Sequence, residues 1–159
     1  MTHPLSVLPS KVESTDNKPW YHQGLRFECT GCGQCCSGGP GYTWVSDNEI
    51  IAIADYLKMD PINFVKKHVR SVSGNLALIE KAYLDEKGNE IYDCIFLKDK
   101  KCQIYPVRPT QCKTFPWWTQ NLHTEKDWEE AATRCEGISK DAPLVDYETI
   151  QKQSAKDFS

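Results

Sequence analysis

Four cysteines lie within eight residues near the start of the chain, in the sequence CTGCGQCC at 29–36. Two thiols separated by two residues can bind one metal ion, because the turn between them brings both sulfurs to the same centre. Gly31 and Gly33 suit such a turn, since glycine adopts positive φ at little cost and lets backbone N–H groups approach the sulfurs. The segment therefore predicts a metal-binding loop with four candidate ligands, Cys29, Cys32, Cys35 and Cys36.

Four further cysteines are spread over the rest of the chain, at Cys94, Cys102, Cys112 and Cys135. Eight cysteines in 159 residues exceed ordinary usage and indicate a disulfide framework, a metal site or dithiol redox chemistry. The first residues lack the basic start and apolar run of a secretion signal, so we expect a cytoplasmic protein with reduced thiols. This favours a metal site in which all eight cysteines are ligands.

Composition restricts the other functions. A hydrophobic content of 40% with 26% charged residues is typical of one globular domain of this length. The net charge of −3 argues against a general nucleic-acid-binding protein, and the longest apolar run, 50–54, is too short to span a membrane. The sequence contains no phosphate-binding glycine loop and no HExxH motif. Whether the protein is an enzyme, and whether it has a protein partner, stay open.

The predicted fold is α+β, a small single domain of short helices and a β-hairpin organised around a multi-cysteine metal site. The domain is expected to cover 20–153, after a flexible lead at 1–19 and before a polar tail at 154–159. Ser46 and Glu49 form a capping box before a helix at about 47–58. A second helix is predicted to start at Asp60–Pro61, with Ile62, Val65 and Val69 as its apolar stripe.

Residues 76–84 and 90–97 predict a hairpin, and a tight turn at 98–101 follows it. Three prolines between 102 and 118 exclude long helices there. Thr124 is expected to cap a helix on which Trp128, Ala131, Ala132 and Cys135 share one face. Asp141 and Pro143 are expected to cap a last helix that reaches about Gln153.

The cysteine-rich segments resemble a known family. CTGCGQCC, followed by CIFLKDKKCQIYPVRPTQCKTFP at 94–116, is similar to the bacterial CxxCxxCC, or YkgJ-like, cysteine-cluster family, described as zinc- or iron-chelating. The resemblance extends over roughly 27–137. It implies that the first seven cysteines are metal ligands, with Arg108 and Pro109 as structural neighbours. Cys135 lies outside the tight motif and is a candidate because of its position on the predicted helix.

The spacing also bears on the metal. The CxxCxxC run at 29–35 is that of cluster-binding ferredoxins, in which one loop supplies three ligands of a cubane. The later cysteines are separated by 7, 9 and 22 residues, unlike the paired CxxC motifs of a zinc ribbon. We therefore favour an iron–sulfur cluster with a redox, cluster-carrier or metal-handling role. The alternative is a structural zinc module that binds a protein partner.

Two finer expectations follow from these segments. Arg108 could donate hydrogen bonds to the cluster sulfurs from outside the ligand set or pair with a carboxylate, and we favour the first role. Cys35 and Cys36 are adjacent, and in an extended segment their side chains would point to opposite sides. We therefore expect them to divide between two centres or to bind different iron atoms of one cluster.

Overall fold

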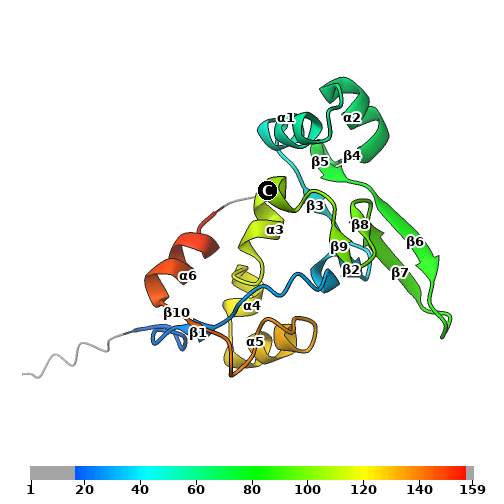
Figure 1. Cartoon of the computed structure of the whole chain (residues 1–159). Helices are drawn as coiled ribbons and strands as arrows, with labels where there is room; N and C mark the ends of the chain where they lie inside the picture. The colour runs from blue at the N-terminus through cyan, green and yellow to red at the C-terminus, as the bar shows by residue number, and fades with distance from the viewer. Residues whose placement is uncertain (1–16, 157–159) are drawn as a thin grey trace, which may run out of the picture.

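The computed structural model describes residues 17–156 and consists of short helices and small antiparallel sheets (Figure 1). The α-helices are α1 (Asp47–Tyr56), α2 (Pro61–His68), α3 (Thr110–Thr114), α4 (Thr119–Leu122), α5 (Glu125–Ala132) and α6 (Tyr147–Ser154), and the 3-10 turns are η1 (Gln34–Cys36) and η2 (Tyr105–Val107). The predicted mixture of helices and strands is confirmed. Most of the predicted flexible lead and the last three residues of the predicted tail lie outside the described residues.

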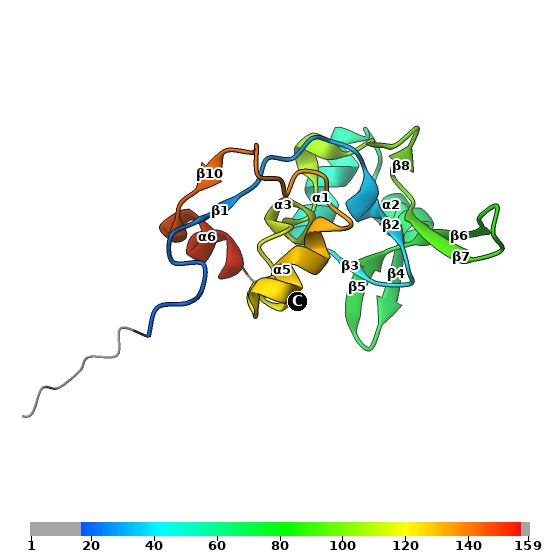
Figure 2. The same ribbon diagram turned by 90° about the horizontal axis from the view of Figure 1, so that it is seen from below.

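The strands are short and pair in four small sheets. They are β1 (Leu25–Arg26), β2 (Ser37–Gly38), β3 (Thr43–Trp44), β4 (Val69–Val72), β5 (Asn75–Leu78), β6 (Glu80–Leu84), β7 (Glu90–Cys94), β8 (Leu97–Lys98), β9 (Lys101–Cys102) and β10 (Leu144–Val145). The sheet orders are β1-β10, β2-β7-β6, β3-β5-β4 and β8-β9. The β6–β7 hairpin stands away from the rest of the molecule in both ribbon views (Figures 1 and 2). Strand β2 follows the cysteine loop directly and pairs with β7, so this sheet joins the loop to the strand that ends at Cys94.

Two apolar clusters form the core. The first lies around α1, α2 and β5 and includes Ile53, Phe64 and Leu78. The second is formed by Trp117, Leu122, Trp128 and Ile150, in which Trp117 stacks on Trp128 with ring centroids 5.3 Å apart. The helices of the two clusters occupy opposite ends of the ribbon in Figure 1. Between residues 17 and 156, no helix has both the length and the apolar character needed to cross a membrane.

Local capping signals identified three helix starts correctly. Asp60 caps α2 before Pro61, its carboxylate accepting from Asn63 N at 3.1 Å. Ser46 caps α1, its side chain accepting from Glu49 N at 3.3 Å while Glu49 Oε2 accepts from Ser46 N at 2.8 Å. Thr124 caps α5 in the same reciprocal way with Asp127. The predicted tight turn at 98–101 is also confirmed, because β8 and β9 flank it and deliver Cys102.

Other predicted elements are wrong in extent. Helix α2 ends at His68, and Val69 begins strand β4. The buried residue of α2 is Phe64, whereas Ile62 is 64% exposed. The strand predicted at 76–84 is divided between β5 and β6, which belong to different sheets.

The last helix begins later than predicted. Asp146 caps α6, its carboxylate accepting from Thr149 N at 2.8 Å, so Asp141 and Pro143 are not its start. Leu144 and Val145 instead form β10, which pairs with β1. Strand β10 has two residues, and its partner β1 lies about 120 residues earlier in the chain. Such a strand leaves no local sequence pattern, so the predicted helix wrongly includes Leu144 and Val145.

Candidate metal centre

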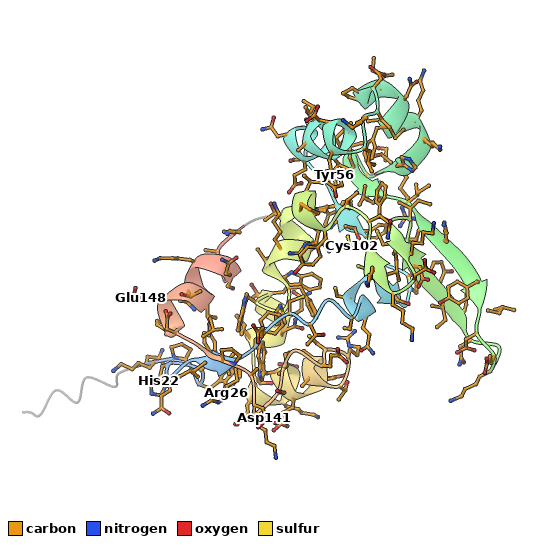
Figure 3. All side chains as sticks on the ribbon, in the orientation of Figure 1. His22, Arg26, Tyr56, Cys102, Asp141 and Glu148 are labelled. Carbon is orange, nitrogen blue, oxygen red and sulfur yellow. The ribbon has the colours of Figure 1, made fainter. Side chains whose placement is uncertain are left out.

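All eight cysteines line one cavity of about 120 Å³. The cavity lies between the two apolar clusters, because Phe27 packs on the second cluster while Leu78 and Ile104 belong to the first, and all three line the cavity. Figure 3 shows Cys102 between the end of the molecule that carries α1 and α2 and the end that carries α5. The fold thus brings together thiols from residues 29 to 135.

The chemistry of the lining is that of a soft-metal site. Among the described residues that line the cavity there is no aspartate, glutamate or histidine, and the charged residues are Arg108, Lys113 and Arg134. Thiolates select Zn²⁺ and iron–sulfur clusters, whereas Mg²⁺ and Ca²⁺ require oxygen ligands. The three cations offset the negative charge that accumulates when several thiols ionise in one place.

The cysteine loop is fixed against the β8–β9 turn. Gly33 has φ 75°, and a Cβ on it would lie 2.5 Å from the carbonyl oxygen of Lys100, so only glycine fits there. Cys36 N donates to Gly33 O at 3.0 Å and closes the 3-10 turn η1. The segment is therefore not extended, so its side chains need not alternate between opposite sides. The premise of the prediction for this pair is wrong.

The thiols of Cys35, Cys36 and Cys102 affect one another's ionisation. Interaction with the Cys102 and Cys35 side chains raises the pKa of Cys36 above its ordinary value. Interaction with Cys36 lowers the pKa of Cys35 to about 7 and that of Cys102 to about 6, and the positive charge of Arg108 lowers both further. Near neutral pH Cys102 is therefore mostly ionised and Cys35 about half ionised, which is the form that binds a metal.

Cys94 and Cys112 lie deeper. Burial raises the pKa of Cys94 to about 11 and also raises the pKa of Cys112, to which the charges of neighbouring cysteines contribute. The two come from different elements, since Cys94 ends β7 and Cys112 lies on α3. Both must lose a proton before they can bind a metal ion.

Helix α3 is held in place from two sides. The Gln111 side chain accepts from Trp44 N at 2.8 Å and donates to Tyr42 O at 2.9 Å, which ties α3 to β3. Glu49 Oε1 accepts from Thr110 N at 2.6 Å, which ties α3 to the start of α1. Burial alone would raise the pKa of Glu49, but hydrogen bonds from the N–H groups of Ser46 and Thr110 lower it below its usual value. These bonds fix the backbone that carries Cys112.

Cys135 lines the cavity as predicted, but the predicted helix does not position it. Helix α5 ends at Ala132, so Cys135 is not on the helix. Two contacts hold its segment against the cysteine loop: Glu28 N donates to Gly137 O at 3.0 Å, and Thr30 Oγ1 donates to Glu136 Oε1 at 2.6 Å. Burial, and then the charges of Cys32 and Cys35, raise the pKa of Cys135. Pairing between distant backbone segments, and not a helical stripe, positions this thiol.

Arg108 lines the cavity together with a residue that the sequence analysis missed. The Arg108 guanidinium carbon lies 3.7 Å from the centre of the Tyr105 ring, and the Tyr105 hydroxyl donates to Cys29 Sγ at 3.7 Å. Tyr105 belongs to the CxIY pair of the motif at 102–105, which was the available signal. Its hydroxyl could not be assigned a partner from sequence, because Cys29 is 76 residues away.

The thiols are gathered but not yet at coordination distance. As the side chains stand, no group of three or more His, Cys, Asp or Glu within the described part of the chain is placed to hold a metal ion. All eight cysteines are free thiols, with Cys29 and Cys35 exposed and the other six partly buried. The assignment of the eight cysteines and of Arg108 to a metal site therefore stays a prediction.

Comparison with known proteins identifies the family. A family model named CxxCxxCC, described as "Putative zinc- or iron-chelating domain", matches residues 28–136. The chain belongs to the CxxCxxCC family. The matched region contains all eight cysteines, so the resemblance found in the motifs is confirmed. The family description supports chelation of zinc or iron and does not distinguish between them.

A curated protein that is similar to this chain carries no functional description. Over 102 residues the chain is 35% identical to the uncharacterized protein MJ0661 of Methanocaldococcus jannaschii. The alignment covers 63% of this chain and 50% of that protein, so the chain spans about half the length of this relative. No solved structure matches the chain.

Proposed function

We propose that this CxxCxxCC protein chelates iron as an iron–sulfur cluster, through its eight cysteines, in a redox, cluster-carrier or metal-handling role in the cytoplasm. The observation that carries the proposal is the lining of the cavity, which has eight thiols and, among the described residues, no carboxylate or imidazole. Such a donor set fits a soft metal centre and fits no hard cation. A bound cluster would supply one-electron chemistry or would itself be the cargo.

Three features favour a cluster. The CxxCxxC spacing lets one loop supply Cys29, Cys32 and Cys35 to a single polynuclear centre. Apolar side chains, among them Leu78 and Ile104, line the same cavity and exclude water from one side of it. The lining cations Arg108, Lys113 and Arg134 offset the charge of a thiolate-bound centre.

Thiols from distant parts of the chain affect one another's ionisation. After burial, the charge of Cys35 is among the causes that raise the pKa of Cys112, on α3, and that of Cys135. All eight cysteines also line the same cavity. Both observations support one assembly over two independent knuckles. Metal binding would draw the thiols together by reorienting their side chains around the cavity.

A second candidate is a structural zinc module that binds a protein partner. It is favoured by the mutual influence of Cys35, Cys36, Cys94 and Cys102, since the other three all act to raise the pKa of Cys36. Four neighbouring thiols are the usual ligand set of a structural zinc ion. In that case the metal would stabilise the junction of the two apolar clusters and would do no chemistry.

Anaerobic purification followed by metal analysis, acid-labile sulfide analysis and absorption spectroscopy tests the proposal. We expect iron and sulfide in comparable amounts and a brown protein. A colourless protein with zinc and no sulfide would establish the second candidate instead. A well-folded, reduced protein that retains neither metal, and that takes up neither when offered iron with sulfide or zinc, would overturn metal chelation itself.

A further inference from the structure

Two segments that are 76 residues apart meet at the mouth of the cavity through side chains. Cys29 is one of the two exposed thiols, and its sulfur accepts a hydrogen bond from the Tyr105 hydroxyl at 3.7 Å. Tyr105 is itself 44% exposed, so this contact lies at the opening and not in the interior. A metal ion that enters from solvent would contact Cys29 early, and one that leaves would lose its bond to Cys29 last.

The Tyr105 ring is held in one orientation. Arg108 donates from Nε to the Tyr105 carbonyl at 3.0 Å, and its guanidinium carbon lies 3.7 Å from the ring centre. The ring belongs to η2, whose backbone is restricted by Pro106 and, just after the turn, by Pro109. A planar cation stacked on a ring in a restricted turn aims the hydroxyl at a fixed point. That point is Cys29 Sγ.

We propose that Tyr105 is a positioning residue that holds Cys29 as the outermost ligand and thereby sets the rate at which the metal is released. The inference rests on the proposed metal-chelating function. A hydrogen bond to a ligating sulfur fixes its direction and stabilises its anionic form, as partners outside a ligand set do. Without the Tyr105 hydroxyl, Cys29 can still bind the metal, but its sulfur dissociates from the metal more readily.

The test uses Co²⁺ as a spectroscopic probe in the full chain, loaded anaerobically into reduced, metal-free protein. Tyr105→Phe should retain the wild-type stoichiometry of Co²⁺, but the sulfur-to-cobalt charge-transfer band should move to lower energy. Transfer of Co²⁺ to EDTA should be about five- to tenfold faster, the effect expected for one ordinary hydrogen bond.

Tyr42→Phe is a matched control. Tyr42 is 48% exposed and has its own stacked guanidinium, with Arg70 at 5.0 Å from the ring centre, but it does not line the cavity. This variant should match the wild type in both band position and release rate. If Tyr105→Phe also matches the wild type while Co²⁺ binds normally, the inference is wrong and the proposed chelation stands. If the wild type binds no Co²⁺, chelation itself has failed.

A second pair of variants ties the effect to one sulfur. In a Cys29→Ala background, Tyr105→Phe should change neither the band nor the release rate further, because the side-chain acceptor of the hydrogen bond has gone. An undiminished acceleration in that background would overturn the assignment to Cys29. Circular dichroism of each metal-free variant checks that the comparison is made between folded proteins.

Discussion

Metal loading should release a countable number of protons, because several thiols around the cavity must ionise first. Near pH 7.5 Cys94, whose pKa burial raises to about 11, is protonated, whereas Cys102, whose pKa is lowered to about 6 by its contact with Cys36, is already ionised. At about 1.4 kcal/mol per pH unit, ionising Cys94 costs about 5 kcal/mol, which its bond to the metal must exceed. Cys94→Ser should therefore lower the number of protons released per metal by about one, and Cys102→Ser should leave that number nearly unchanged.

The assay is calorimetric titration of reduced, metal-free protein with Zn²⁺ in two buffers of different ionisation enthalpy, whose difference gives the proton count. Cys36, Cys94, Cys112 and Cys135, whose pKa values are raised, should together contribute about four of the protons released on complete loading of the wild type. The sign follows from competition between protons and metal: affinity falls as the pH falls, by about tenfold per pH unit for each proton released. Equal losses of protons in the two serine variants would refute the reasoning.

Three further perturbations follow from the structure. Glu49→Ala should lower the free energy of unfolding by about 2–3 kcal/mol, because the N–H groups of Ser46 and Thr110 lose their acceptor. Those bonds lower the pKa of Glu49 in the folded protein, so they contribute fully to stability above pH 4.5, the ordinary pKa of a glutamate. The contribution is lost as the pH falls through the lowered pKa of the folded protein. Urea titrations should therefore show this pH-dependent loss of stability in the wild type and not in the variant. Lys100→Gly should raise the free energy of unfolding by about 1 kcal/mol, because Lys100 has φ 61°, and metal content should not change. Cys135→Ser should lower the metal bound per chain in elemental analysis; unchanged stoichiometry would place this thiol outside the ligand set.

The sequence predicted what depends on neighbouring residues. Ser46 and Thr124 carry complete capping boxes within four residues, so the starts of α1 and α5 could be identified. The position of Cys135 could not, because backbone pairing between Glu28 and Gly137 determines it. The contact of Tyr105 with Cys29 likewise joins two segments that only the folded chain brings together. The cysteines themselves were evident from spacing, whereas the residues that position them were not.

The pairing of Glu28 with Gly137, and of Thr30 with Glu136, has a consequence for the entropy of binding. A metal held by both Cys29 and Cys135 would close a loop of 106 residues, the difference of the two positions. In an unfolded chain a crosslink of that span restricts conformation by on the order of 4–5 kcal/mol. Here two hydrogen bonds also join the ends of that loop. Protein contacts therefore meet part of the loss of chain freedom, and the metal–thiolate bonds have less of it to offset.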